Sequence, residues 1–360
     1  MRIVLLFVLV AAPMTAAAQG RWEVEVHAGG TLNNQPAAGD PTLPAPGVPF
    51  TTANGLPSRR ESSWYFGDGA TLVNQVSAAR GLSARITPLD TVLTSAVAQR
   101  GNGGAFGFRI TRSFTTRYAA EFSFDYRRTP VTLSAGALAG IEASRAGFGS
   151  VFSVPLPAGP QGTAPTMSAT SIATVDPERG SQALSTGVIN INLTTASRFT
   201  PYVSLGAGVV TNSSDAPSAT LVGNYRITGP PGTPMASVVV HDETDTVTLR
   251  YAVDGHDFVG VVGGGVRYAV SPRWGVRLDI RAHLGRNGVS NVLDATPSIK
   301  TLTPATVLAL PTNPSIQFSN NPSTGAQSSL AAPAVTDFQT FRGTGIRVQT
   351  NIVSGVYWRF

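Results

Sequence analysis

The stretch WGVRLDIRAHL, residues 274–284, alternates apolar and polar side chains along its whole length. Trp274, Val276, Leu278, Ile280 and Leu284 share one side, and Arg277, Asp279, Arg281 and His283 share the other. A period of two residues predicts a β-strand, because successive side chains of a strand point to opposite faces. The segment is therefore expected to be a strand with one apolar face and one charged face.

Seven further stretches carry the same period. They are residues 21–29, 105–111, 118–127, 187–193, 202–210, 258–268 and 345–360. Together with 274–284 they make eight strands, each near the ~9–11 residues that a tilted strand needs to cross the hydrocarbon of a bilayer. The sequence therefore favours a sheet whose strands cross a membrane.

The connections between these strands alternate in length. Three are short, at 112–117, 194–201 and 270–273, whereas four are long and rich in Pro, Gly, Ser, Thr and Ala, at about 30–103, 128–183, 211–256 and 285–344. Short turns at one end and long loops at the other are typical of outer-membrane barrels. We expect an all-β fold: an up-and-down antiparallel transmembrane β-barrel of eight strands, with short periplasmic turns and four long extracellular loops.

Two alternatives stay open at this point. A soluble, secreted β-sandwich would also contain antiparallel strands, although its outward faces would carry more charge. The barrel could also hold ten strands, and the segment SSWYFG (62–67) is where an extra strand would lie.

The composition excludes several classes of site. The chain has no cysteine, so it contains no disulfide, zinc–thiolate site or thiol nucleophile. Its charge of +6 comes almost entirely from arginines that are scattered along the sequence, which argues against nucleic-acid binding. Only 13% of the residues are charged, against roughly 25% in ordinary soluble domains.

The first residues, MRIVLLFVLVAAPMTAAA (1–18), have the pattern of a secretory signal peptide. Arg2 precedes an apolar run, and Ala16 to Ala18 form a small-residue cleavage site. We expect the mature chain to begin at Gln19, residues 19–360 to form the barrel with its loops, and the protein to lie in the bacterial outer membrane.

The C-terminal residues Gly355-x-x-Trp358-x-Phe360 resemble the Gly-x-x-aromatic-x-aromatic signal of the eight-stranded outer-membrane barrel family typified by the OmpA transmembrane domain. The stretches PYVSLGAGV (201–209) and VRYAVSPRWGVRLDIR (266–281) also resemble strand–turn–strand segments of its outer membrane protein β-barrel domain branch. Val353 departs from the polar residue usual in that signal. The resemblance implies recognition of Gly355, Trp358 and Phe360 by the barrel-assembly machinery, and a monomer that contacts outer-membrane lipids and lipopolysaccharide.

The inward face of the predicted barrel is charged. Its predicted network contains Glu23, Glu25, Arg109, Glu121, Asp125, Arg127, Arg277, Asp279, Arg281 and Arg347, and Arg267 and Arg359 share the same face. Side chains fill the interior of an eight-stranded barrel, and buried charges must pair, so we expect a plug without an open pore. A narrow or gated channel with a slight anion preference is the alternative.

No chemistry beyond this network is expected. His27 and His283 face inward, whereas His241 and His256 lie in the acidic runs HDETD (241–245) and DGHDF (254–258), which are typical of solvated turns. We therefore predict no catalytic, metal or cofactor site and no enzyme activity. The predicted function is a structural or interaction scaffold that presents its loops to an unknown extracellular ligand. A channel is the alternative, and an outer-membrane enzyme with an active site at the rim is favoured least.

The first long loop has local patterns of its own. Residues 68–82 and 89–101 have helical spacing, with Asp68 and Asp90 at their starts, and predict two short helices over the barrel mouth. The Pro-rich stretch 37–49 predicts an unstructured or polyproline-like segment.

Overall fold

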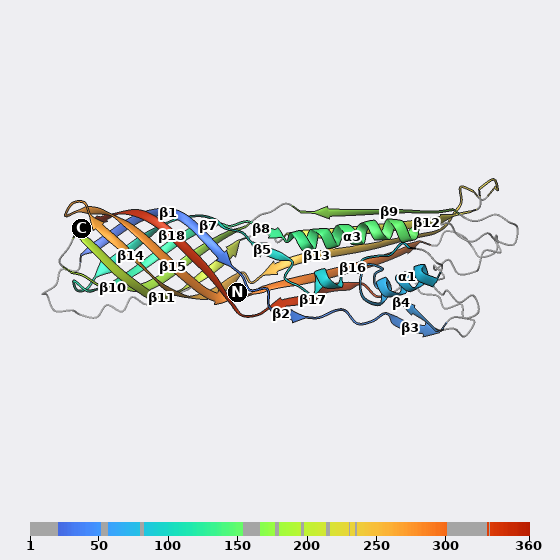
Figure 1. Ribbon diagram of the computed structural model, residues 1–360, viewed down its shortest axis with the longest axis horizontal. Coiled ribbons are helices and arrows are strands. Elements are labelled where there is room, and N and C mark those ends of the chain that lie inside the picture. Colours follow the sequence, from blue (N-terminus) through green and yellow to red (C-terminus); the bar gives the residue numbers. More distant parts are fainter. Residues whose placement is uncertain are drawn as a thin grey trace.

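The structure is a computed structural model in which a barrel and an extension lie end to end (Figure 1). It describes residues 21–51, 57–79, 83–153, 166–176, 180–195, 198–213, 217–229, 231–234, 236–300, 330 and 332–360. The predicted signal peptide and the predicted first mature residue, Gln19, lie outside these residues.

Eight antiparallel strands close into the barrel in the order β1-β18-β15-β14-β11-β10-β7-β6. β1 pairs with both β18 and β6, so the sheet has no free edge. The strands are β1 (Trp22–Asn34), β6 (Gly103–Ser113), β7 (Tyr118–Arg128), β10 (Ser181–Asn192), β11 (Phe199–Ser213), β14 (His256–Ala269), β15 (Trp274–Arg286) and β18 (Ile346–Arg359). The predicted fold, an eight-stranded up-and-down barrel, is confirmed, and the two-sheet sandwich is wrong.

The three predicted short connections all lie at one end of the barrel. They join β6 to β7, β10 to β11 and β14 to β15, and the C-terminus lies at this end too (Figure 1). At the opposite end the chain continues into the extension.

A six-stranded antiparallel sheet forms the extension, in the order β2-β17-β16-β13-β12-β9. Its strands are β2 (Gly39–Pro41), β9 (Thr166–Val175), β12 (Ser218–Thr228), β13 (Val239–Val253), β16 (Val289–Lys300) and β17 (Val335–Gly343). Only residues 254–255, 287–288 and 344–345 separate β13, β16 and β17 from the barrel strands β14, β15 and β18. Much of what the sequence predicts as loop is therefore strand that prolongs the barrel wall.

Three helices and two small two-stranded sheets complete the described part of the extension. The helices are α1 (Gly67–Ala79), α2 (Asp90–Leu93) and α3 (Ala135–Phe152). One two-stranded sheet pairs β3 (Val48–Thr51) with β4 (Pro57–Arg60), and the other pairs β5 (Ala98–Arg100) with β8 (Val131–Leu133), on either side of β6 and β7 in sequence. α3 packs on β9 and β12, where the Phe152 and Tyr225 rings stack with centroids 4.7 Å apart. Among the described residues, no helix is both long enough and apolar enough to span a membrane.

Several local predictions need correction. SSWYFG (62–67) adds no strand, because Trp64 and Tyr65 are fully buried in the core of the extension. The stretch 37–49, predicted to be unstructured, contains β2 and the start of β3. The helix predicted at 89–101 ends at Leu93 and is followed by β5, whereas the helix predicted at 68–82 corresponds to α1.

Candidate functional site

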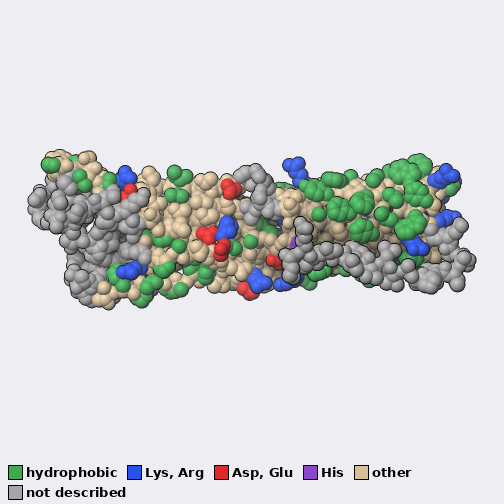
Figure 2. All heavy atoms as spheres, turned by 180° about the vertical axis from the view of Figure 1, so that it is seen from behind, with side chains coloured by type: hydrophobic (Ala, Val, Ile, Leu, Met, Phe, Trp, Pro, Cys, Tyr) green, Lys and Arg blue, Asp and Glu red, His purple; other side chains and the backbone are tan. Residues whose placement is uncertain are grey.

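The outer wall of the barrel is a continuous apolar belt. In the eight barrel strands, all of which the structure describes, no charged side chain faces outward between Arg112 at the turn end and Arg128 and Arg286 at the mouth. Val26, Leu205 and Phe258 are exposed by 57%, 68% and 83%. Figure 2 shows apolar side chains covering the barrel, in contrast to the extension.

The height of this belt follows from β1. Trp22 to Leu32 is ten steps of about 3.3 Å, and a tilt of about 40° gives a height of about 25 Å, as in transmembrane barrels. Exposed aromatic side chains surround the turn end: Trp22, Phe114, Tyr118, Phe199, Tyr268, Trp274, Trp358 and Phe360. Arg112 lies over the rings of Trp22 and Phe114. The wall thus has the dimensions and the aromatic border of a lipid-facing surface.

Six charged side chains meet at the centre of the lumen, and we call them the central cluster. It comprises Glu25, Arg109, Glu121, Arg277, Asp279 and Arg281, each 3% exposed or less. Glu121 lies 2.8 Å from Arg277 and 2.7 Å from Arg281. Arg109 lies 3.1 Å from Glu25 and 3.3 Å from Asp279. Three carboxylates thus balance three guanidinium groups, as expected for charges excluded from water.

The contacts of Glu121 cross the barrel. Glu121 lies on β7, whereas Arg277 and Arg281 lie on β15, four strands away in either direction around the ring of eight. A direct ion pair between opposite walls leaves little width for water at this height. The central cluster therefore spans the lumen from wall to wall.

The remaining predicted network residues are also buried in the lumen. Toward the turn end, Glu23 pairs with Arg359 at 3.1 Å and lies 3.9 Å from Arg267. Toward the mouth, Asp125 pairs with His27 at 2.7 Å. Arg127 and Arg347, nearest the mouth, lack a close carboxylate partner of this kind, although Arg347 lies 3.5 Å from Asp257.

The predicted network omits residues that the structure places inside it. His27 was identified only as inward-facing, yet it holds Asp125. Tyr202 accepts a hydrogen bond from Arg277 Nε at 2.5 Å and donates to Asp279. Both residues have inward parity on their strands, so the same period could have found them. Parity alone could not show which neighbours they reach.

The C-terminal motif lies where β18 meets β1. Trp358 and Phe360 are exposed on the outer wall, by 49% and 78%, and the Phe360 N–H donates to the Trp22 carbonyl at 2.9 Å. A Cβ at Gly355 would lie 2.6 Å from Glu25 Oε1 and 2.9 Å from the Cβ of His27. Glycine at this position therefore makes room for two lumen side chains, apart from any role in assembly.

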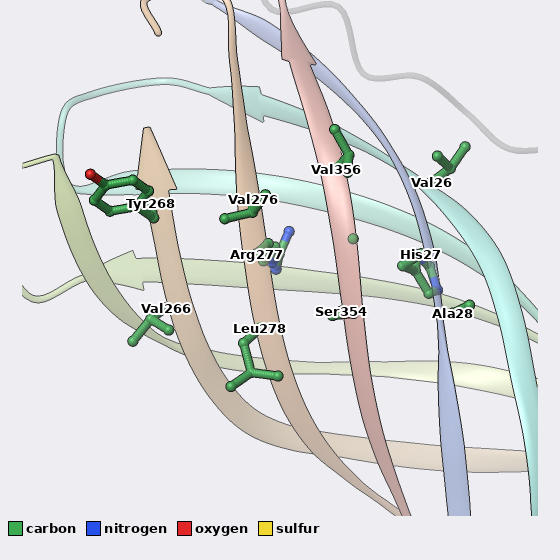
Figure 3. Close-up of a pocket in the computed structure, with 11 residues that line it drawn as sticks. Val26, His27, Ala28, Val266, Tyr268, Val276, Arg277, Leu278, Ser354 and Val356 are labelled. Atoms are coloured by element: carbon green, nitrogen blue, oxygen red, sulfur yellow. The ribbon is translucent and has the colours of Figure 1, made fainter. Parts of the chain in front are cut away.

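A shallow hollow lies on the outer wall over β1, β14, β15 and β18 (Figure 3). It forms because Ala28, Ser354 and Gly355 are small and are surrounded by larger apolar side chains: Val26, Val266, Tyr268, Val276, Leu278 and Val356. His27 and Arg277 also border the hollow, although their side chains belong to the lumen. The hollow is thus a part of the apolar belt.

A second buried acidic site holds the segment before α1 against β13. Asp245 accepts hydrogen bonds from Ser63 Oγ at 2.9 Å and from the Trp64 backbone N–H at 2.6 Å. Glu243 accepts from Trp64 Nε1 at 2.6 Å. Burial raises the pKa of Asp245 to about 7, and Glu243 contributes in the same direction. Residues 63–64 and these two acids form what we call the Trp64 latch.

The acidic runs near the third long loop do not gather ligands within the described residues. No group of three or more His, Asp and Glu side chains there has the arrangement of a metal site. His256 Nδ1 lies 3.1 Å from the Thr211 hydroxyl, and the side chain of His241 is outside the described part.

The similarity of the chain to known proteins is remote. No protein-family model and no curated protein matches the sequence. Among solved structures, the chain is similar to the outer membrane protein OprG from Pseudomonas aeruginosa, at 7% identity and a TM-score of 0.32, over 94% of this chain and 95% of that chain. Because this TM-score is low, the assignment of the barrel to a membrane rests on the closed sheet and its apolar belt.

Proposed function

We propose that the protein is an integral barrel of the bacterial outer membrane, exported by its signal peptide, which acts as a scaffold that presents its extension outside the cell. The observation that carries this proposal is the uncharged, ~25 Å apolar belt around a sheet without edges. In lipid every backbone polar group must pair within the protein, and a closed sheet satisfies that requirement.

A scaffold is favoured over a channel because the lumen is crossed by ion pairs. The 2.7–2.8 Å contacts of Glu121 with Arg281 and Arg277 join opposite walls, and their guanidinium groups are buried. The alternative, a narrow or gated channel, is supported by the excess of arginine over acidic side chains in the lumen. Neither function requires catalysis, and we assign no enzyme activity.

The partners follow from the same arrangement. Lipids would contact the apolar belt, and lipopolysaccharide would surround its mouth end. The assembly machinery would read Gly355, Trp358 and Phe360, of which the two aromatic side chains are exposed. The extracellular ligand is unknown, and we propose a monomer, because the barrel closes within one chain.

Refolding of the mature chain into lipid vesicles tests the proposal. An inserted barrel should migrate differently on a detergent gel before and after heating, and protease added outside should leave the barrel strands uncut. A chain that stays outside the vesicles and shows no heat-dependent migration would contradict membrane insertion.

A further inference from the structure

Three buried arginines from three elements gather where the lumen meets the extension. Arg127 of β7, Arg347 of β18 and Arg100 of β5 are 0%, 3% and 6% exposed. No carboxylate of the described residues lies within ion-pair distance of Arg100 or Arg127, in contrast to the arginines of the central cluster. We call these three residues the mouth arginines.

Neutral groups alone bind two of them. Arg127 donates to Gln349 Oε1 at 3.1 Å and lies 3.2 Å from a ring nitrogen of His283. The Asn351 amide, turned so that its nitrogen donates to Thr31, offers Arg127 an oxygen at 2.8 Å. Arg100 donates to the Thr129 hydroxyl at 3.0 Å and to Asn212 Oδ1 at 3.3 Å. These acceptors satisfy hydrogen bonds, but they do not neutralise two buried charges.

Arg347 leaves its donors largely unused. Its guanidinium makes no hydrogen bond to another described residue, and its buried Nη2, without a hydrogen-bond partner, lies 3.5 Å from Asp257 Oδ2. Arg347 acts electrostatically on Arg100. Burial, together with repulsion by Arg347, lowers the pKa of Arg100 to about 10, although Tyr251 acts in the opposite direction.

A chain of side-chain amides links the mouth arginines across the junction. Gln349 Nε2 donates to Gln182 Oε1 at 3.0 Å, and Gln182 Nε2 donates to Asn212 Oδ1 at 2.7 Å. Gln349 and Asn212 are also the acceptors for Arg127 and Arg100. An amide presents N–H donors as readily as an acceptor when it rotates. The junction can therefore surround an anion with guanidinium and amide donors.

We propose that the mouth arginines form a binding site for a small inorganic anion, such as chloride or phosphate. Of the three positive charges, only Arg347 has a carboxylate of the described residues within ion-pair distance, that of Asp257. Asp254 and Asp125 act on Arg347 and Arg127 from farther away, and Asp125 is already paired with His27. One bound anion would give Arg100 and Arg127 the close negative partner that they lack. This site requires neither a conducting lumen nor a particular extracellular ligand, so it goes beyond the proposed scaffold function.

Thermal unfolding of the full mature chain, refolded in uncharged detergent, tests the site. Sodium chloride or sodium phosphate replaces sodium gluconate at constant ionic strength, and Tm is followed as a function of anion concentration. A ligand that binds only the folded state stabilises it by RT ln(1 + c/Kd), where c is the concentration of the free ligand, so Tm rises with that concentration even beyond saturation of the site. We expect chloride or phosphate to raise Tm in this way. Gluconate, a larger anion, should not. The anion that acts at the lower concentration identifies a halide or an oxyanion site.

Variants assign the effect to the site. Arg127→Gln and Arg100→Gln should each raise the required anion concentration by roughly tenfold or more, because each removes a charge-assisted donor. Arg145→Gln, a change at a partly exposed arginine of α3 that pairs with Glu142, is the control and should respond as the wild type does. Should Arg127→Gln fail to fold, Arg100→Gln decides, because β5 lies outside the barrel. An equal rise in gluconate, or an unchanged response of Arg100→Gln, would overturn the proposal.

Discussion

At the scale of single residues, burial decides what each lumen charge contributes. Glu121 is 3% exposed and faces three guanidinium groups, whereas Glu142 on α3 is a solvated partner of Arg145. Removal of a buried partner leaves charges that neither water nor protein compensates. Exposed ion pairs contribute little, because water replaces the lost contact.

Glu121→Gln should therefore destabilise the barrel by roughly 3–5 kcal/mol, the usual effect of orphaning a buried charge. Urea unfolding of the refolded protein in lipid, followed by tryptophan fluorescence, measures this change. Glu142→Gln is the matched control and should leave the unfolding midpoint unchanged. Equal midpoints for the two variants would show that the central cluster is solvated.

The outward assignment of Leu278 can be tested in the same assay. Leu278→Arg places a charge against lipid near the middle of the belt and should cost ~2–4 kcal/mol relative to Leu278→Ala. The side chain is 49% exposed and lies among apolar neighbours on the outer wall. If the arginine variant inserts as well as the alanine variant, Leu278 does not face lipid.

At the scale of elements, the period of two residues predicted all eight barrel strands, because each alternates an apolar outer face with a lumen face of charged, polar or small residues. The same rule could have identified β12 and β13, since Leu221, Tyr225, Val247 and Leu249 are buried at alternate positions. Their Thr-rich and Ser-rich surroundings resemble loops, which hid the pattern. Helix α3 was not predicted, because it is rich in Ala and Gly and its apolar stripe is weak.

The stability of the Trp64 latch should depend on pH. The pKa of Asp245 is about 7 in the folded protein and near 3.9 in an unfolded chain. The folded state therefore binds more protons between these values, and the latch loses stability as pH rises from about 4 to 7. Glu61, whose pKa burial also raises to about 7, acts in the same direction.

Limited proteolysis of the segment around Trp64 measures this effect. We expect faster cleavage at pH 8 than at pH 5, and a smaller difference in Asp245→Asn, whose amide oxygen keeps the acceptor for Ser63 and Trp64. Asp242→Asn, on the same strand but paired with the exposed Arg226, should keep the wild-type dependence of cleavage on pH. A pH difference that persists undiminished in Asp245→Asn would exclude this residue as its source.

Phe360 tests the C-terminal motif. Phe360→Ala removes a side chain that is 78% exposed, so the loss of burial within the protein is small, and contact with lipid is worth at most ~2 kcal/mol. If the assembly machinery recognises this residue, the amount of inserted protein in cells should fall far more than the yield of refolding in vitro. If Phe360 acts only through stability, the amount of inserted protein in cells and the yield of refolding in vitro should fall equally.

At the scale of the whole molecule, the sequence predicted the closed barrel but not the extension. The charged lumen was predictable because parity assigns each side chain to a face. Parity and height also allow Glu121 to meet Arg277 and Arg281 across the lumen. Which charges pair, and at what distance, depends on the tilt and register of strands that are distant in sequence. The mouth arginines combine residues from the barrel and the extension, and neither part alone indicates the site.

The ion pairs that cross the lumen lead to a prediction about conductance. Refolded protein in a planar bilayer should show no steady conductance, since Glu121, Arg277 and Arg281 join opposite walls. Single-channel recording measures this, with Glu121→Gln as a variant in which loss of the pairs should permit brief openings. Long-lived, uniform conductance steps from the wild type would favour the channel.

The continuity between barrel and extension has a mechanical consequence. β13, β16 and β17 run into the barrel wall through two-residue breaks, and the 15 residues of β13 span about 50 Å at 3.3 Å each. A load applied to the far tip would pull along the strands, so it would shear many ladder hydrogen bonds at once instead of unzipping them one by one. The extension would then be a stiff element that transmits tension from an attached object directly to the barrel.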